Sequence, residues 1–322
     1  MRLFFGNDTS YFSRFIFLIL STTWLYAQES KSDDTFTVVL DAGHGGKDSG
    51  NRGNQYYEKH IALNVTLKIG AILKKYSDIN IIYTRKSDVF IPLNKRADIA
   101  NTAKADLFVS VHCDAHTSNA YGAGTFVLGL HENDRNFRIA QKENSVIFLE
   151  EDYEKNYDGF DPNNPESVIS LVLMQETYLD QSIQAANTIQ QSFVRNLKRK
   201  NRTVKQAGFL VLRNTYMPSV LVELGFLTNK IEGAYLNSKK GQTEMSEAIA
   251  KAIVAYKNQL QSDLQEDVIF EDNSVNSAEE STTSGYVFRV QISASKTALE
   301  PKSFKFKGLS PIKRGKRAVY TN

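Results

Sequence analysis

The sequence predicts an α/β fold: a mostly parallel, twisted sheet of about six strands, flanked by helices and carrying a helical regulatory insertion. The first observation is that apolar runs of four to six residues alternate with longer stretches in which apolar residues have helical spacing. The second is composition, since 41% hydrophobic residues in a chain of 322 can fill one substantial core. We therefore expect one folded domain over residues 35–260.

The apolar runs are expected to form the strands, because each is short and bounded by turn-forming or polar residues. The predicted strands are Thr35–Asp41, Asn80–Thr84, Leu107–His112, Thr125–Leu128, Phe209–Leu212 and Val220–Leu224. Helical spacing links Ile61, Val65 and Ile69, and it recurs after residue 93. Two longer helices are predicted over 177–200 and 244–260.

Both ends of the chain differ from this pattern. Residues 1–27 place Arg14 before a short apolar stretch that ends at Ala27, which is typical of a secretory signal peptide; a retained anchor is the alternative. Residues 28–34 are a short polar leader. Residues 261–285 are acidic and rich in Ser, Thr and Asn, which predicts a disordered linker. Residues 286–322 are basic and begin with strand-like alternation.

Charge and cysteine content narrow the classes of function. The net charge of +3 is too small to indicate a nucleic acid as partner. The single cysteine, Cys113, excludes a disulfide within the chain, so packing, with or without a metal, must stabilise the fold. Cys113 follows His112 on a strand and must point to the opposite face, which favours core packing over a nucleophile.

The glycine-rich loop "GHGGKDSG" lacks the spacing of a phosphate-binding loop. It does hold His44, just after the first strand, and His112 ends another strand at the same edge of a parallel sheet, where ligands bind. Glu58 opens the helix after the first strand. Two imidazoles and one carboxylate form the ligand set of a catalytic zinc site. Glu223, which closes a later strand, can be the carboxylate that takes a proton from water.

A resemblance covers residues 36–260. This part resembles the zinc-dependent N-acetylmuramoyl-L-alanine amidases of cell-wall turnover and division, through "LDAGHGGKDSG", "YYEKHIALNV", "YTRKSD", "LNKRADIAN", "ADLFVSVHCDAH", "GAGTFVLG" and "PSVLVELGFLTN". The resemblance implies Zn2+ held by His44, Glu58 and His112, with Glu223 as the catalytic carboxylate. The enzyme would cut the amide bond that links muramic acid to L-alanine in peptidoglycan. Asp114 departs from the family, which more often has Asn there.

Three further side chains are candidates for substrate binding. Arg85 and Arg96 could recognise substrate carboxylates, or could instead form ion pairs with Asp88 and Asp98. His116 is near enough in sequence to line the cleft, although a surface position is the alternative.

Residues 130–176 form an insertion far longer than an ordinary connection. In division-type members of the family, a comparable insertion covers the zinc until a protein activator displaces it, which implies an autoinhibitory lid here; simple decoration is the alternative. Glu150 and Glu151 follow the apolar "VIFL" and are the candidates to block the metal.

The C-terminal segment 286–322 looks like the first half of a SPOR-type peptidoglycan-binding domain, or else a basic tail. Together these features predict an exported, periplasmic or envelope amidase with no stable membrane anchor after signal cleavage. Another exported zinc peptidase acting on the stem peptide, or a non-catalytic wall-binding protein, are the alternatives.

Overall fold

The computed structural model describes residues 35–130, 133–167 and 176–275, and the chain divides into a unit of residues 1–268 and a second unit of residues 269–322. The predicted signal peptide, leader and SPOR-like segment lie outside the described residues. The first unit is built on a six-stranded sheet with the order β4-β1-β5-β8-β6-β7. All neighbouring strands are parallel except the antiparallel pair β6–β8. The predicted fold class is confirmed.

The central strands are almost wholly buried, since helices cover both faces of the sheet. The strands are β1 (Phe36–Ala42), β4 (Ile79–Tyr83), β5 (Leu107–Asp114), β6 (Ala123–Leu128), β7 (Asn201–Ala207) and β8 (Ser219–Phe226). A two-stranded hairpin, β2 (Arg52–Gly53) and β3 (Tyr56–Tyr57), precedes the first helix. The carboxyl ends of β1, β5 and β8 therefore meet at one edge of the sheet.

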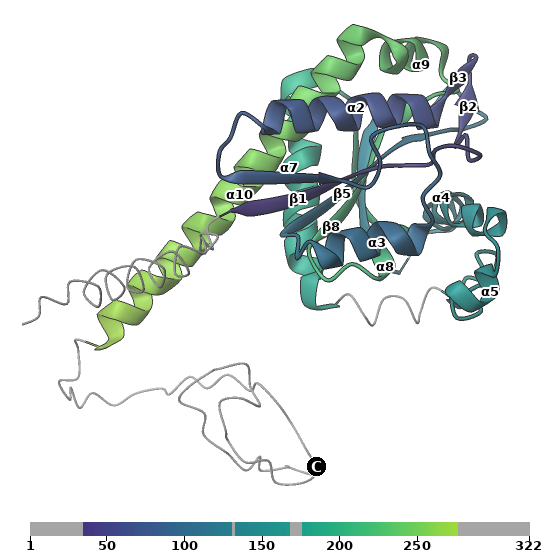
Figure 1. Ribbon diagram of the computed structural model, residues 1–322. Coiled ribbons are helices and arrows are strands. Elements are labelled where there is room, and N and C mark those ends of the chain that lie inside the picture. Colours follow the sequence, from purple (N-terminus) through teal and green to yellow (C-terminus); the bar gives the residue numbers. More distant parts are fainter. Residues whose placement is uncertain (1–34, 131–132, 168–175, 276–322) are drawn as a thin grey trace, which may run out of the picture. The chain divides into compact units, whose positions relative to one another are not determined.

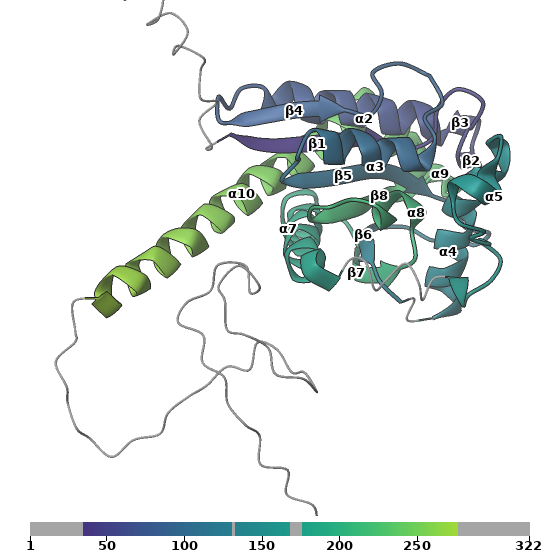
Figure 2. The ribbon, with the colours of Figure 1, turned by 60° about the horizontal axis from the view of Figure 1, so that its bottom comes forward.

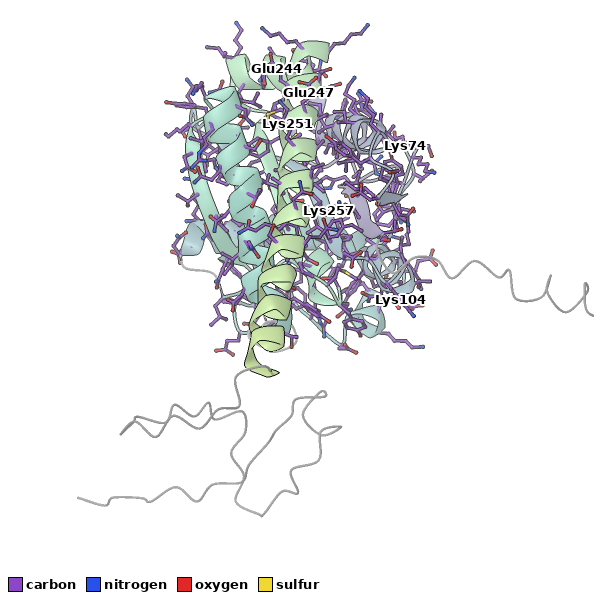
Figure 3. All side chains as sticks on the ribbon, turned by 90° about the vertical axis from the view of Figure 1, so that its left-hand side faces the viewer. Lys74, Lys104, Glu244, Glu247, Lys251 and Lys257 are labelled. Carbon is purple, nitrogen blue, oxygen red and sulfur yellow. The ribbon has the colours of Figure 1, made fainter. Side chains whose placement is uncertain are left out.

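One face of the sheet packs against the three longest helices and α9, which share one hydrophobic core with β1, β5 and β8 (Figures 1 and 2). These helices are α2 (Glu58–Leu73), α7 (Leu179–Leu197), α9 (Lys230–Asn237) and α10 (Lys239–Val275). Figure 3 shows α10 running along this side, with Lys257 labelled. Lys257 is buried and pairs with Asp78, just before β4, while Glu247 and Lys251 face solvent.

The opposite face carries a second set of helical elements, which form a second core with the other side of the sheet. They are α3 (Leu93–Thr102), α4 (Asp134–Asn144), η1 (Ser145–Leu149), α5 (Tyr153–Asn156) and α8 (Leu210–Arg213). A further 3-10 turn, η2 (Glu176–Tyr178), leads into α7. In Figures 1 and 2, α4 and α5 lie at the same end of the sheet as the β2–β3 hairpin. The insertion thus lies beside the carboxyl ends of the strands.

Two predictions about elements were wrong. Residues 209–212 were expected to form a strand but begin the short helix α8, because a brief apolar run does not distinguish a strand from a buried helix. The sixth strand is instead β7, which lies at the sheet edge and is largely polar and partly exposed. The predicted linker also differs, since α10 continues to Val275 and so includes its first part.

Every helix within the described residues is too short or too polar to cross a membrane.

Candidate active site

The loop after β1 presents His44 to the edge of the sheet. His44 has a φ of 61°, and its Nδ1 lies 2.7 Å from an oxygen of Asp48, which leaves Nε2 facing inward. Gly43 allows this close packing, because a Cβ atom there would lie 2.4 Å from the ring of His112. A Cβ on Gly50 would likewise lie 2.5 Å from His44 and 2.7 Å from Glu58. The glycines therefore let the loop approach both imidazoles.

Glu58, the first residue of α2, bridges the two histidines. One carboxylate oxygen lies 3.0 Å from Nδ1 of His112 and accepts a hydrogen bond from the backbone N–H of Cys113 at 2.7 Å. The other oxygen lies 3.0 Å from Nε2 of His44 and accepts from the N–H of Asn51 at 2.7 Å. These contacts hold Glu58, which is fully buried, between β1 and β5.

A fourth group, Glu143 at the end of α4, completes the cluster. Its Oε2 lies 3.1 Å from Nε2 of His44 and 3.1 Å from Nδ1 of His112. The sequence analysis missed this residue and selected Glu150 and Glu151 instead. Helical periodicity could have identified Glu143, because Asn136, Ala140 and Glu143 share the buried face of α4. Asn133 caps the start of this helix.

The four side chains fit a metal ion. Their ligand atoms all lie within 4.8 Å of one another, and all four residues are buried. Two imidazole nitrogens with carboxylate oxygens form a donor set that suits zinc. Nε2 of His44 and Oε2 of Glu143 are buried and close together, yet neither has a hydrogen-bond partner among the described residues. A metal ion placed between these atoms would be a ligand partner for both.

The charges of the neighbouring side chains determine the protonation state of each histidine and glutamate in this cluster. Burial lowers the pKa of His44, but the carboxylates of Glu58 and Glu143 outweigh it and raise that pKa well above its usual value. For Glu58 the directions are reversed. Burial raises its pKa, but His44 and His112 outweigh burial and lower the pKa well below the usual value. Without a cation, the site is therefore a buried network of imidazolium and carboxylate groups.

Glu223 lies on β8 directly beside His112 on β5, and residues in register on neighbouring strands point to the same face. It is fully buried, and neither of its carboxylate oxygens has a hydrogen-bond partner among the described residues. Burial, followed by the charges of Asp114 and Glu143, raises its pKa well above the usual value. Cys113 points to the opposite face and packs in the core beneath α2.

Comparison with protein families decides the identity of this domain. The family model described as N-acetylmuramoyl-L-alanine amidase matches residues 38–255. This chain belongs to the N-acetylmuramoyl-L-alanine amidase family. It is an enzyme that hydrolyses the amide bond between N-acetylmuramic acid and L-alanine in peptidoglycan.

Curated relatives agree with the family assignment. The N-acetylmuramoyl-L-alanine amidase AmiA of Salmonella typhimurium is 34% identical over 224 residues, which are 68% of this chain and 75% of that protein. AmiA of Escherichia coli is 32% identical over 231 residues, 70% of this chain and 78% of that protein. Among solved structures, the amidase of Clostridium difficile 630 matches with a TM-score of 0.54 and 26% identity, over 70% of this chain and 98% of that one.

Arg85 and Arg96 of this amidase, proposed from the sequence as substrate contacts, are 3% and 1% exposed. Arg85 donates to the backbone carbonyls of Ala42, Gly43, Lys59 and Ser87. Arg96 donates to the carbonyls of Ala42, His44 and Ile91 and pairs with Asp41 at 2.9 Å, rather than with Asp98. These contacts do not support a substrate-binding role. Both guanidinium groups hold the loop that carries His44.

The remaining predicted residues lie around the cluster rather than in it. His116 lines a cavity of about 530 Å³ next to Glu143, together with Arg135, Arg138 and Lys142 of α4. Glu150 instead accepts a hydrogen bond from the hydroxyl of Tyr157 at 2.8 Å, and Glu151 is exposed. Neither glutamate thus belongs to the cluster in this structure, and Glu143 is the residue of the insertion that reaches both histidines.

Proposed function

We propose that the protein is a zinc-dependent peptidoglycan amidase, in which His44, Glu58 and His112 hold Zn2+. The convergence of these three side chains at one edge of the sheet is the observation that carries the proposal. They come from the loop after β1, the start of α2 and the end of β5, so the fold itself brings them together. A bound zinc ion would supply a Lewis acid that polarises the scissile carbonyl and makes water more acidic.

Glu223 is proposed as the group that handles protons. It lies on the same face as His112, and its two oxygens are free to accept a proton from the attacking water. The same carboxyl would then deliver the proton to the amine of L-alanine as the amide bond breaks. A position beside a metal ligand, rather than in the ligand set, suits this task.

The insertion is proposed to inhibit the enzyme. Glu143 approaches both imidazoles from α4, so its carboxylate would compete with the scissile carbonyl for the metal. A protein activator would withdraw α4 and so open the site. We also propose that residues 1–27 export the protein to the periplasm or cell envelope, and that it acts in wall remodelling or daughter-cell separation.

Product analysis tests the proposal. The mature protein is incubated with purified peptidoglycan, with and without a chelator, and the soluble products are identified by mass spectrometry. Release of intact stem peptides, lost with chelator and restored by zinc, is expected. Stems that remain partly attached to the glycan would indicate a peptidase, and activity unchanged by chelation would exclude the metal.

A further inference from the structure

Asn144, the residue after Glu143, makes a pair of contacts that inhibition at the metal cluster does not require. Its side-chain N–H donates to the backbone carbonyl of Gly208 at 2.7 Å. Its side-chain oxygen accepts from the backbone N–H of Leu210 at 2.8 Å. Asn144 is only 2% exposed, so one buried carboxamide satisfies two backbone groups in the segment after β7.

The spacing of these two backbone groups is that of a strand edge, which the side chain of Asn144 occupies. The carbonyl of Gly208 and the N–H of Leu210 flank Phe209, and a parallel strand uses this pair to bind one residue of its neighbour through that residue's own N–H and C=O. If α4 moves away, both groups lose their partner. A buried backbone donor or acceptor without a partner is costly, so a new partner is required.

The position of the pair indicates what that partner is. Asn144 and Phe209 line one small cavity together with His44, His112 and Glu143. The two backbone groups therefore lie next to the place where the amide bond would be cleaved. The cavity has a volume of only about 10 Å³ while α4 is in place, so a substrate would reach the two groups beside Phe209 after α4 has moved away.

We propose that Gly208 and Leu210 form a subsite for the peptide stem of the substrate, which binds one extended residue by its N–H and C=O. In the closed state Asn144 occupies this subsite with its carboxamide, while Glu143 occupies the metal cluster. The inference rests on the proposed inhibition by the insertion. The acetamido group of the sugar is a poorer fit, because the N–H and C=O of one trans amide point in opposite directions.

Proline at position 210 would remove the backbone N–H donor of this residue and change the backbone conformation little. Leu210 is the first residue of α8, where proline is tolerated, and Phe209 has φ −79° and ψ 120°, which a following proline accepts. Leu210→Ala is the matched control, since it shortens the same side chain and keeps the N–H. Both substitutions are made in the full chain carrying Glu143→Ala and Asn144→Ala, so that the insertion blocks neither the metal site nor the subsite.

A soluble muramoyl peptide is the probe, and kcat/KM, zinc content and thermal unfolding are measured for each variant. Leu210→Pro is expected to lower kcat/KM roughly tenfold below Leu210→Ala, the effect of one lost hydrogen bond, with zinc content unchanged. Equal kcat/KM in the two folded variants would overturn the subsite. Absence of cleavage in the parent with Glu143→Ala and Asn144→Ala, by contrast, would count against the proposed function.

A second measurement does not depend on the folding of the proline variant. In the chain with Glu143→Ala and Asn144→Ala, a substrate whose first stem amide beyond the scissile bond is replaced by an ester should be cleaved roughly tenfold less efficiently, because the ester is a weaker acceptor and has no N–H. Unchanged efficiency would overturn the proposal. A muramoyl peptide without the N-acetyl group should show the same penalty for Leu210→Pro, and loss of that penalty would assign the subsite to the sugar.

Discussion

At the scale of single residues, the site separates groups that would hold a metal from the group that would move a proton. His44, Glu58 and His112 contact one another, whereas Glu223 lies beside them with both oxygens unpartnered among the described residues. This separation is what allows each role to be removed alone.

Replacing Glu223 by alanine should leave the metal bound and abolish most turnover. Loss of a positioned general base typically costs about 10²–10⁴ in rate. Zinc content by atomic absorption and release of stem peptides check this result, with Glu151→Ala as the exposed control. Substantial cleavage by the Glu223→Ala variant would remove this residue from the mechanism. The matching variant His44→Ala should lose zinc as well as activity.

Asp41 is the residue whose charge most directly supports the His44 loop. It is fully buried and accepts hydrogen bonds from Arg96, Thr84 and Ser110. Burial raises its pKa, but the charge of Arg96 and the two hydroxyl groups lower it below 3.8 overall. Its contribution to stability is therefore present above about pH 4 and is lost as the pH falls through the folded-state pKa.

The substitution Asp41→Asn should lower the free energy of unfolding by about 3–5 kcal/mol at pH 7, because it leaves Arg96 buried without a counter-charge. Urea unfolding at pH 7 measures the effect, and the difference from the parent should shrink below about pH 4. Asp98→Asn, in an exposed pair with Lys95, is the control and should change stability by less than about 1 kcal/mol. A loss of similar size in both variants would contradict this account.

At the scale of elements, α4 and the segment that follows it are the parts that sequence periodicity described least well. The apolar residues before Glu150 drew attention to that carboxylate, yet Val146 and Ile147 point into the core, and Glu150 turns toward Tyr157. Whether a carboxylate near an apolar run faces a metal depends on the orientation of the helix, which spacing alone does not give. The residues on β1, β5 and β8 were predictable because strand ends define one edge.

The variant Glu143→Ala should raise basal activity, since it removes the carboxylate that approaches both histidines. Coupling energies between a regulatory element and a site commonly change activity by about 5–150-fold, and a rise of roughly tenfold is expected here. Hydrolysis of labelled peptidoglycan without any activator measures it. Glu150→Ala, on the same insertion but away from the cluster, should give no rise. Unchanged activity in a Glu143→Ala variant that retains zinc would contradict inhibition by this residue.

At the scale of the whole molecule, the alternation of strands and helices predicted the layered α/β domain, but it missed β7 and placed a strand at α8. An edge strand needs no apolar run, because one side faces solvent, and a buried helix of four residues leaves no period to detect. The metal cluster joins elements of this domain that are distant in sequence, so its occupancy should affect global stability.

Zinc should raise the unfolding temperature of the full chain. Ligand at 1,000 times its Kd stabilises the folded state by about 4 kcal/mol, which corresponds to a rise of roughly 10 °C for a domain of this size. Calorimetry with chelator and with added zinc measures the shift. The His112→Ala variant should show none, and an equal shift in that variant would mean that zinc binds elsewhere.

The pairing of His112 with Glu223 across β5 and β8 has a consequence for how such enzymes diversify. Their separation is set by a backbone ladder in the interior, not by any surface loop. Rim loops other than the one that carries His44 can therefore be lengthened or exchanged to suit new wall architectures, while the distance between His112 and Glu223 stays the same. Engineers who wish to retarget this hydrolase can graft at the periphery and leave those two strands untouched.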